Sequence, residues 1–323
     1  MSGQTREHAE VARALGVRSL IVAVNQMDCV GWSRERFEEV RDGLAPLLDE
    51  LGFSSPPPAF VPLSALHGAN LSAASRPPTG LEWYQAAGGI GSLMEAIDAV
   101  APCPRTSRVG TRMCVSEVAR SGSSVGVSGT LQAGTLAPGQ KLLLTPSREV
   151  AIVKSVRSRG VVVPPGQNLT AGDHCELTLG AIDPSIVGSG HVLCDPLRVV
   201  PLARRVEVRL RALAPRTPLT RGQPFELYVH AAACCATLRK IVTTLTDTDS
   251  GTSCDGGGAG ASGAGVPPPR SLATGARALV QFDLEQPVPL ETYADCPPLG
   301  RVVIRDGGAT VAVGVISAIL REA

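Results

Sequence analysis

The sequence predicts a multidomain protein in which an α/β domain is followed by two β-barrels. Three observations support this fold class. The chain has 323 residues, more than a single hydrophobic core usually holds. Helix-like and strand-like apolar patterns alternate over the first hundred residues, which is typical of a sheet covered by helices. From about Val109 onward, short valine-rich runs alternate with glycine- and proline-containing turns, which is typical of small barrels.

Four elements are expected in the first part of the chain. Residues 5–15 have apolar side chains at helical spacing and end at Gly16, a suitable helix C-terminus. Residues 19–25 form a continuous apolar run that predicts a buried parallel strand. A second helix is expected from Ser33, its candidate N-cap, to Gly52, and a second strand over residues 59–65. This order indicates a parallel sheet whose function lies at the carboxyl ends of its strands.

The domain boundaries follow from changes in composition. A short helix is expected over 92–100, and the prolines at 102 and 104 indicate a linker. We therefore place a partial α/β domain at 1–101, the first barrel at 102–200 and the second at 201–323. A Gly/Ser/Ala tract at about 250–269 carries too little apolar surface to fold alone, so we expect a flexible surface insertion.

Composition excludes several classes of protein. The formal net charge is +1, so no large overall field attracts nucleic acid or an anionic membrane, and any RNA contact must be local. The nine cysteines form no C-x-x-C pair and do not cluster with the five histidines, which disfavours disulfides and zinc. We find no secretion signal and no apolar stretch of about 18 residues, so we expect a soluble, cytoplasmic protein. The pair Cys234 and Cys235 lies in an apolar run and is expected to be two buried strand thiols.

Two polar loops contain the residues that indicate a ligand-binding site. The first, Asn25-Gln26-Met27-Asp28, follows the first predicted strand, and Ser64-Ala65-Leu66 follows the second. Recognition of guanine needs an acceptor for the N1 and N2 hydrogens and donors for O6. Asp28 suits the first task, Asn25 can brace the loop, and the backbone N–H of Ala65 can face O6. Alone, an N-x-x-D sequence is more often ordinary turn chemistry. The second loop at the right distance favours a guanine site.

These motifs resemble those of a known family. Residues 2–8, 14–17 and 24–28 look like the stretch from switch II through the guanine-specificity loop of translational GTPases of the elongation factor 1-alpha superfamily. Residues 64–66 resemble the second base-recognition motif of that family. Residues 129–134 and 136–139 resemble its second domain, and residues 299–306 and 310–314 resemble the end of its third. The resemblance implies a partial P-loop-type G domain followed by two barrels, with GTP or GDP bound through Asn25, Gln26, Asp28, Ser64, Ala65 and Leu66.

Within the superfamily, the sequence is most similar to the ribosome-rescue GTPases that partner Pelota. Residues 28–37 continue directly from the specificity loop, and residues 171–179, 278–282 and 289–293 agree with that group, although residues 191–196 are also similar to release factor 3. The resemblance implies GTP-dependent delivery of a Pelota-like release-factor paralogue to stalled ribosomes in no-go and non-stop mRNA surveillance. The ribosome is then a partner, and neither a membrane nor DNA is expected.

The sequence also departs from the family pattern. A working GTPase needs a Gly-rich phosphate loop with its lysine, a switch threonine for Mg²⁺ and a D-x-x-G segment, and none of these precedes Ser2. We therefore expect an N-terminally truncated G domain without a Mg²⁺ site, and no GTP hydrolysis by this chain alone. Gln26 stands where the family usually has lysine, and its shorter, uncharged side chain should weaken guanine binding.

Other interpretations stay open. The two barrels alone could form a non-enzymatic module that binds a partner or the ribosome. The protein could also be a release factor 3-like or elongation factor 1-alpha-like factor that binds a release factor or aminoacyl-tRNA. Arg204, Arg205, Arg209 and Arg211 alternate along a predicted strand and could contact ribosomal RNA, although a solvated barrel face has the same pattern.

Overall fold

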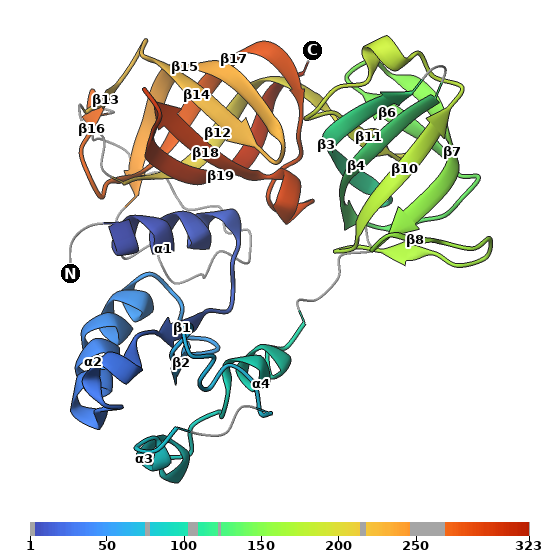
Figure 1. Ribbon diagram of the computed structural model, residues 1–323. Helices are drawn as coiled ribbons and strands as arrows, with labels where there is room; N and C mark the ends of the chain where they lie inside the picture. Colours follow the sequence, from blue (N-terminus) through green and yellow to red (C-terminus); the bar gives the residue numbers. More distant parts are fainter. Residues whose placement is uncertain are drawn as a thin grey trace. The chain divides into compact units, whose positions relative to one another are not determined.

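A computed structural model describes residues 4–74, 78–102, 109–121, 124–213, 218–245 and 269–322. The chain divides into two compact units, residues 1–103 and 104–323. Figure 1 labels most of the helices and strands of both units. The predicted glycine-rich insertion lies almost wholly outside the described residues, as does most of the predicted linker.

The described residues of the first unit form two parallel strands and four helices. Strand β1 (Ile21–Val24) pairs in parallel with β2 (Ala59–Pro62), and Val24 is opposite Pro62 at their carboxyl ends. The helices are α1 (Gln4–Leu15), α2 (Arg34–Glu50), α3 (Glu82–Ala86) and α4 (Leu93–Asp98), with a 3-10 turn at Met27–Val30. The helix, strand, helix, strand order predicted from the sequence is confirmed, and α3 is an element that the sequence did not predict.

Helix α2 begins and packs as its sequence predicts. The Ser33 hydroxyl accepts a hydrogen bond from the Arg36 backbone N–H at 3.2 Å, so Ser33 is the N-cap. Phe37, Leu44 and Leu48 on one face of the helix are buried. That face packs on apolar side chains near the strands, including the half-buried Phe60.

The prediction that the first strand is buried was wrong for most of its length. Ile21 and Val22 are half-buried, Ala23 is exposed and only Val24 is buried. Within the described residues β1 has one neighbouring strand, β2. A parallel strand is a continuous apolar run when both its faces are covered, and the described residues around β1 leave Ala23 exposed.

The second unit begins with a barrel whose strands run from Arg112 to Cys194. Its sheet has the order β10-β4-β3-β11-β6-β7-β8, and β10 also pairs with β7, which closes the ring. The strands of this sheet are β3 (Arg112–Ser121), β4 (Ser124–Ala133), β6 (Lys141–Thr145), β7 (Glu149–Ser158), β8 (Val161–Val162), β10 (His174–Gly180) and β11 (Val192–Cys194). The short strands β5 (Thr135–Leu136) and β9 (Leu169–Thr170) pair with each other in a separate sheet. A 3-10 turn at Pro184–Ile186 precedes β11.

The predicted turn after β4 requires glycine at position 134. Gly134 follows β4 with a φ of 75°, a conformation that side chains with a Cβ rarely adopt. A Cβ at this position would meet the carbonyl carbon of Gly110 at 2.6 Å. The turn therefore allows two backbone segments to approach closely.

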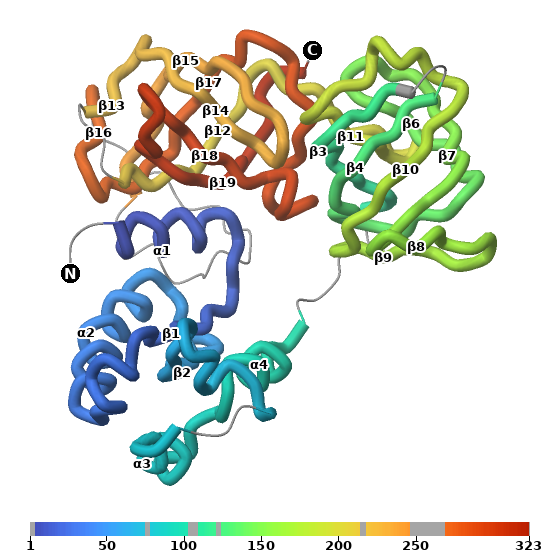
Figure 2. The backbone as a smooth tube through the Cα atoms, in the orientation of Figure 1, coloured from blue at the N-terminus to red at the C-terminus, as the bar shows by residue number. Residues whose placement is uncertain are grey.

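The second barrel closes in the order β12-β17-β15-β14-β18-β19. The barrel strands are β12 (Leu202–Ala212), β14 (Pro224–Val229), β15 (Ala232–Leu245), β17 (Arg277–Pro289), β18 (Arg301–Asp306) and β19 (Ala309–Glu322), with a 3-10 turn at Pro297–Leu299. The short strands β13 (Leu219–Thr220) and β16 (Ser271–Leu272) pair with each other in a separate sheet. In Figure 2 the first barrel is traced in green and the second in yellow to red. The fold class predicted from the sequence is confirmed.

A mixed core links the two barrels within the second unit. Cys114, Val192 and Cys194 from the first barrel belong to the same buried cluster as Cys296 and Leu299 from the second. A buried ion pair crosses the same region, because the Arg112 guanidinium donates to the Glu291 carboxylate from Nε at 3.0 Å and from Nη2 at 2.8 Å. The two side chains are only 3% and 8% exposed.

Candidate functional site

The candidate site lies where β1 and β2 end. Because the strands are parallel and Val24 is opposite Pro62, the loops that follow them emerge side by side. The backbone continues the pairing past the strands, since the Leu63 N–H donates to the Val24 carbonyl at 2.9 Å and the Met27 N–H donates to the Leu63 carbonyl at 3.2 Å. The fold thus brings together the two loops that the sequence singled out.

Asn25 joins the loops directly. Its Oδ1 accepts the Gln26 backbone N–H at 2.8 Å and the Ala65 backbone N–H at 3.0 Å. The bracing role expected for Asn25 is therefore present in the structure. The Ala65 N–H, expected to face guanine O6, already donates to Asn25, so a bound base would share this donor or accept from the Asn25 amide nitrogen.

Asp28 is the anionic group of the site. Its side chain is half-buried in the 3-10 turn Met27–Val30. The neighbouring Ser64 hydroxyl is the main cause of a pKa below the ordinary value for that carboxyl, so Asp28 is ionised near neutral pH. Ser64 Oγ is itself buried and meets hydrogen-bond geometry with no described atom, so it acts on Asp28 by proximity. A ligand could complete this hydroxyl's bonding.

The remaining predicted residues form the exposed rim of the site. Gln26 is exposed and takes a left-handed conformation with a φ of 65°. The Leu66 side chain is 87% exposed, an unusual position for leucine. All six predicted residues thus lie on the two adjoining loops, with only Ser64 buried among them.

His67, which no sequence motif indicated, also lies at the site. Its Nε2 lies 3.6 Å from Asp28 Oδ2, and its side chain is 63% exposed. The available signal was its position directly after Ser64-Ala65-Leu66. The exposed imidazole therefore lies beside the Asp28 carboxylate.

Buried aromatic residues hold the first loop in place from beneath. Met27 and Trp32 belong to a cluster with Phe37 and Tyr84, and the rings of Phe37 and Tyr84 are 5.9 Å apart. The Trp83 indole N–H donates to the Trp32 carbonyl at 2.9 Å. This support limits movement of the loop that carries Asn25 and Asp28.

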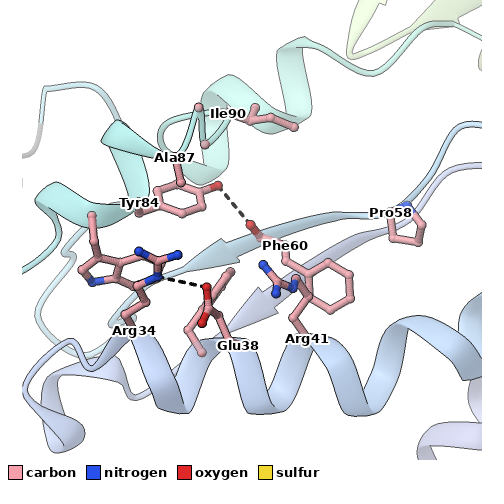
Figure 3. A pocket seen from close by; sticks show the side chains of 12 residues that line it. Arg34, Glu38, Arg41, Pro58, Phe60, Tyr84, Ala87 and Ile90 are labelled. Atoms are coloured by element: carbon pink, nitrogen blue, oxygen red, sulfur yellow. Dashed lines mark hydrogen bonds and ion pairs between the residues drawn. The ribbon is translucent and has the colours of Figure 1, made fainter.

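A separate pocket of about 260 Å³ lies beside the same aromatic cluster. Figure 3 shows it between α2, β2, α3 and the loop that follows α3. An Arg34–Glu38 ion pair at 2.9 Å crosses one side, and the Tyr84 hydroxyl donates to the Phe60 carbonyl at 3.0 Å on the other. The pocket is lined by other residues than the six predicted for guanine.

Comparisons with known proteins identify the family. Residues 1–103 match the family described as Elongation factor Tu GTP binding domain, and residues 205–317 match GTP-eEF1A C-terminal domain-like. The chain is 32% identical over 320 residues to Protein HBS1 of Drosophila melanogaster, covering 99% of this chain and 45% of that protein. It is 30% identical over 316 residues to elongation factor 1-alpha of Thermofilum pendens, covering 98% of this chain and 68% of that protein.

Solved structures agree with this family. The crystal structure of sup35 complexed with GDP is 26% identical, has a TM-score of 0.58, and is matched over 99% of this chain and 74% of that one. Elongation factor SelB from Methanococcus maripaludis, at 15% identity and a TM-score of 0.66, supports the fold alone; the match covers 98% of this chain and 61% of that one. The fold is thus that of a translational GTPase. The chain belongs to the elongation factor 1-alpha family, and it spans about half the length of HBS1.

Two further findings concern the described part of the chain. It contains no helix long and apolar enough to cross a membrane. Nor do its described acidic, histidine and cysteine side chains form a group of three or more that could hold a metal ion.

Proposed function

We propose that this chain recognises guanine at the two adjoining loops, and that it acts as a GTP-binding translation factor of the ribosome-rescue type. In this role it delivers a Pelota-like release-factor paralogue to stalled ribosomes in the cytoplasm. The observation that carries the base-recognition step is the hydrogen bond from Ala65 to Asn25, which ties the two loops together beside an ionised Asp28. The match to HBS1 over nearly the whole chain supports the rescue role.

The residues present fit a guanine base. The Asp28 carboxylate accepts the N1 and N2 hydrogens, and the Ala65 N–H with the Asn25 amide supplies donors for O6 and N7. Gln26 and Leu66 on the exposed rim can cover the two faces of the ring. Adenine has an amino group where guanine has O6 and lacks the N1 hydrogen, so the same groups would reject it.

Nucleotide specificity tests the site. Equilibrium dialysis of the chain should show tighter binding of GDP than of ADP. Replacing Asp28 with Asn should weaken GDP binding about ten-fold to a hundred-fold, since one charge-assisted interaction is lost. The same variant should bind xanthosine diphosphate better than the parent does, because xanthine has a carbonyl oxygen in place of the guanine amino group.

The matched control is Asp49→Asn, an exposed carboxylate near the end of α2. It should leave the preference for GDP unchanged. Guanine recognition at these loops would be contradicted if the parent bound GDP and ADP with equal affinity. It would also be contradicted if Asp28→Asn kept the parent's preference for GDP over ADP.

The partner is tested separately by co-purification. A Pelota homologue should be retained by the immobilised chain, whereas aminoacyl-tRNA should not. Retention of aminoacyl-tRNA without the Pelota homologue would replace the rescue role with that of a tRNA carrier. Retention of the Pelota homologue at equal strength by Asp28→Asn without nucleotide would favour a nucleotide-independent binding module.

A further inference from the structure

Asn70 lies at the base of the second loop of the candidate site. The loop closes just before this residue, because the Ser64 N–H donates to the Ala69 carbonyl at 3.1 Å and the Ala69 N–H donates to the Ser64 carbonyl at 3.0 Å. Asn70 is only 9% exposed, although most asparagines lie at the surface. A buried polar side chain is normally held by hydrogen bonds. The bonds that Asn70 makes therefore show what it does for the loop.

The Asn70 side chain joins two separate backbone segments. Its Nδ2 donates to the Pro62 carbonyl at 2.8 Å and to the Gly91 carbonyl at 3.3 Å. Pro62 is the last residue of β2 and lies opposite Val24, so the first bond is made where the two loops begin. Gly91 directly precedes Ser92, the N-cap of α4. One amide group thus ties the end of the strand to the start of the helix.

Backbone hydrogen bonds reinforce this connection. The Leu93 N–H of α4 donates to the Asn70 carbonyl at 3.1 Å, and the Met94 N–H donates to the Leu71 carbonyl at 3.0 Å. The first N–H groups of a helix have no partner within the helix, and here the segment that follows the loop supplies their acceptors. Because the side-chain bond joins the same two segments, displacement of α4 should also displace the loop.

Asparagine suits this position for two reasons. Its φ is 59°, in the left-handed region that asparagine enters more readily than most side chains do. Its amide nitrogen carries two hydrogens, one for each carbonyl. Aspartate has the same shape without these donors, and glycine tolerates the same backbone conformation without any side chain. Substitution by glycine therefore separates the side-chain bonds from the backbone conformation.

We infer that Asn70 is a positioning residue for guanine recognition, because it holds the second loop between β2 and α4. It acts through Ser64 and Ala65, the two residues of this loop that begin the base-recognition motif. The connection also makes α4 a means of regulating the site, since displacement of the helix loosens the loop and weakens nucleotide binding. This inference rests on the proposed function.

Amide hydrogen exchange of the ¹⁵N-labelled full chain without nucleotide tests the positioning by itself. In the parent, the Ala65 N–H is protected by its hydrogen bond to Asn25. Asn70→Gly removes both side-chain bonds, so the Ala65 N–H should exchange about ten-fold faster. Ser92→Ala removes the N-cap of α4 and should speed the same exchange about three-fold. Unchanged exchange of Ala65 in Ser92→Ala would contradict the connection to α4.

Equilibrium dialysis with GDP gives the second readout. Asn70→Gly should bind GDP about ten-fold more weakly than the parent does, because the loop no longer keeps the Ala65 N–H in place. Asn70→Asp should lose at least as much affinity, since a buried carboxylate would face two carbonyl oxygens. All variants are compared at a temperature below the start of the unfolding transition seen by tryptophan fluorescence.

The matched control is Tyr84→Phe, which removes a side-chain donor to the Phe60 carbonyl of the same strand and keeps the aromatic ring. Its Ala65 exchange rate and its GDP affinity should stay within about two-fold of the parent. Unchanged Ala65 exchange in Asn70→Gly would overturn the inference, and so would equal acceleration in the control.

Two further outcomes are distinguishable. Faster Ala65 exchange in Asn70→Gly with an unchanged GDP affinity would overturn the role in guanine recognition, because the loop would be held without any effect on binding. Equal affinity of the parent for GDP and ADP would contradict the proposed function instead, since the exchange of Ala65 would still show whether Asn70 holds the loop.

Discussion

Replacing Glu291 with alanine should destabilise the two-barrel unit by about 3 to 5 kcal/mol. The Glu291 side chain is 8% exposed and accepts two hydrogen bonds from Arg112, whose side chain is 3% exposed. Removing it leaves a buried guanidinium whose one remaining acceptor among the described residues is the Thr111 carbonyl, at 3.0 Å from Nη1. The cost is that of an uncompensated buried charge, and it exceeds what the intact pair contributes to stability.

The tryptophans allow the two units to be followed separately. Trp32 and Trp83, the only two in the chain, both belong to the first unit, so tryptophan fluorescence reports that unit. Far-ultraviolet circular dichroism follows both units, so a transition that it shows and that tryptophan fluorescence does not show belongs to the two barrels. The melting transition seen by circular dichroism should fall by about 10 °C in Glu291→Ala, while the transition seen by tryptophan fluorescence should not move.

A double variant separates charge burial from packing. Arg112→Met with Glu291→Leu removes both charges and fills the space with apolar atoms, so its stability should be close to or above that of the parent. A loss below 1 kcal/mol in Glu291→Ala would refute the reasoning. So would a double variant as unstable as the single one.

Iodoacetamide should label Cys29 and Cys235 quickly, since both thiols are exposed, and should spare Cys175, where burial raises the pKa of the thiol to about 12. Peptide mass spectrometry would show the reverse order of labelling if this is wrong. The affinity for GDP should stay constant down to about pH 5 and should decrease once the pH is below about 4, because Asp28 must remain ionised and its pKa lies below the ordinary 3.8. A loss of affinity already at pH 6 would indicate that another group titrates. The chain alone should release no phosphate from GTP in a malachite green assay, since no G-x-x-x-x-G-K-[ST] sequence occurs in it. Phosphate release by the parent chain that Asp28→Asn abolishes would contradict this. Ser33→Ala should cost the first unit about 1 kcal/mol by tryptophan fluorescence, and an unchanged transition would show that the cap is dispensable.

Local patterns explain how much of the fold could be predicted. The apolar runs ending before Asn25 and Ser64 located both parallel strands, and Ser33 located the start of α2. Each of these signals lies within a few residues of the feature it predicts. The expectation that Cys234 and Cys235 are both buried was wrong, because alternating strand positions face opposite sides and Cys235 is exposed.

The missed features depend on long-range pairing. Arg112 and Glu291 are 179 positions apart, and no periodicity indicates that they meet. The pairing of Arg211 with Arg277 depends on the register of β12 against β17, which alternation alone leaves open. In the candidate site, the loops could be predicted from their motifs, but the Ala65 hydrogen bond to Asn25 could not, because it depends on the distance between two backbones.

Nuclear magnetic resonance of the ¹⁵N-labelled chain tests guanine recognition most directly. Adding GDP should shift the amide resonances of Ala65, Gln26 and Asp28, because the base would share the Ala65 N–H and bind beside the other two. ADP at the same concentration should leave them in place. Equal shifts with both nucleotides, or GDP-induced shifts confined to residues outside the two loops, would contradict the account.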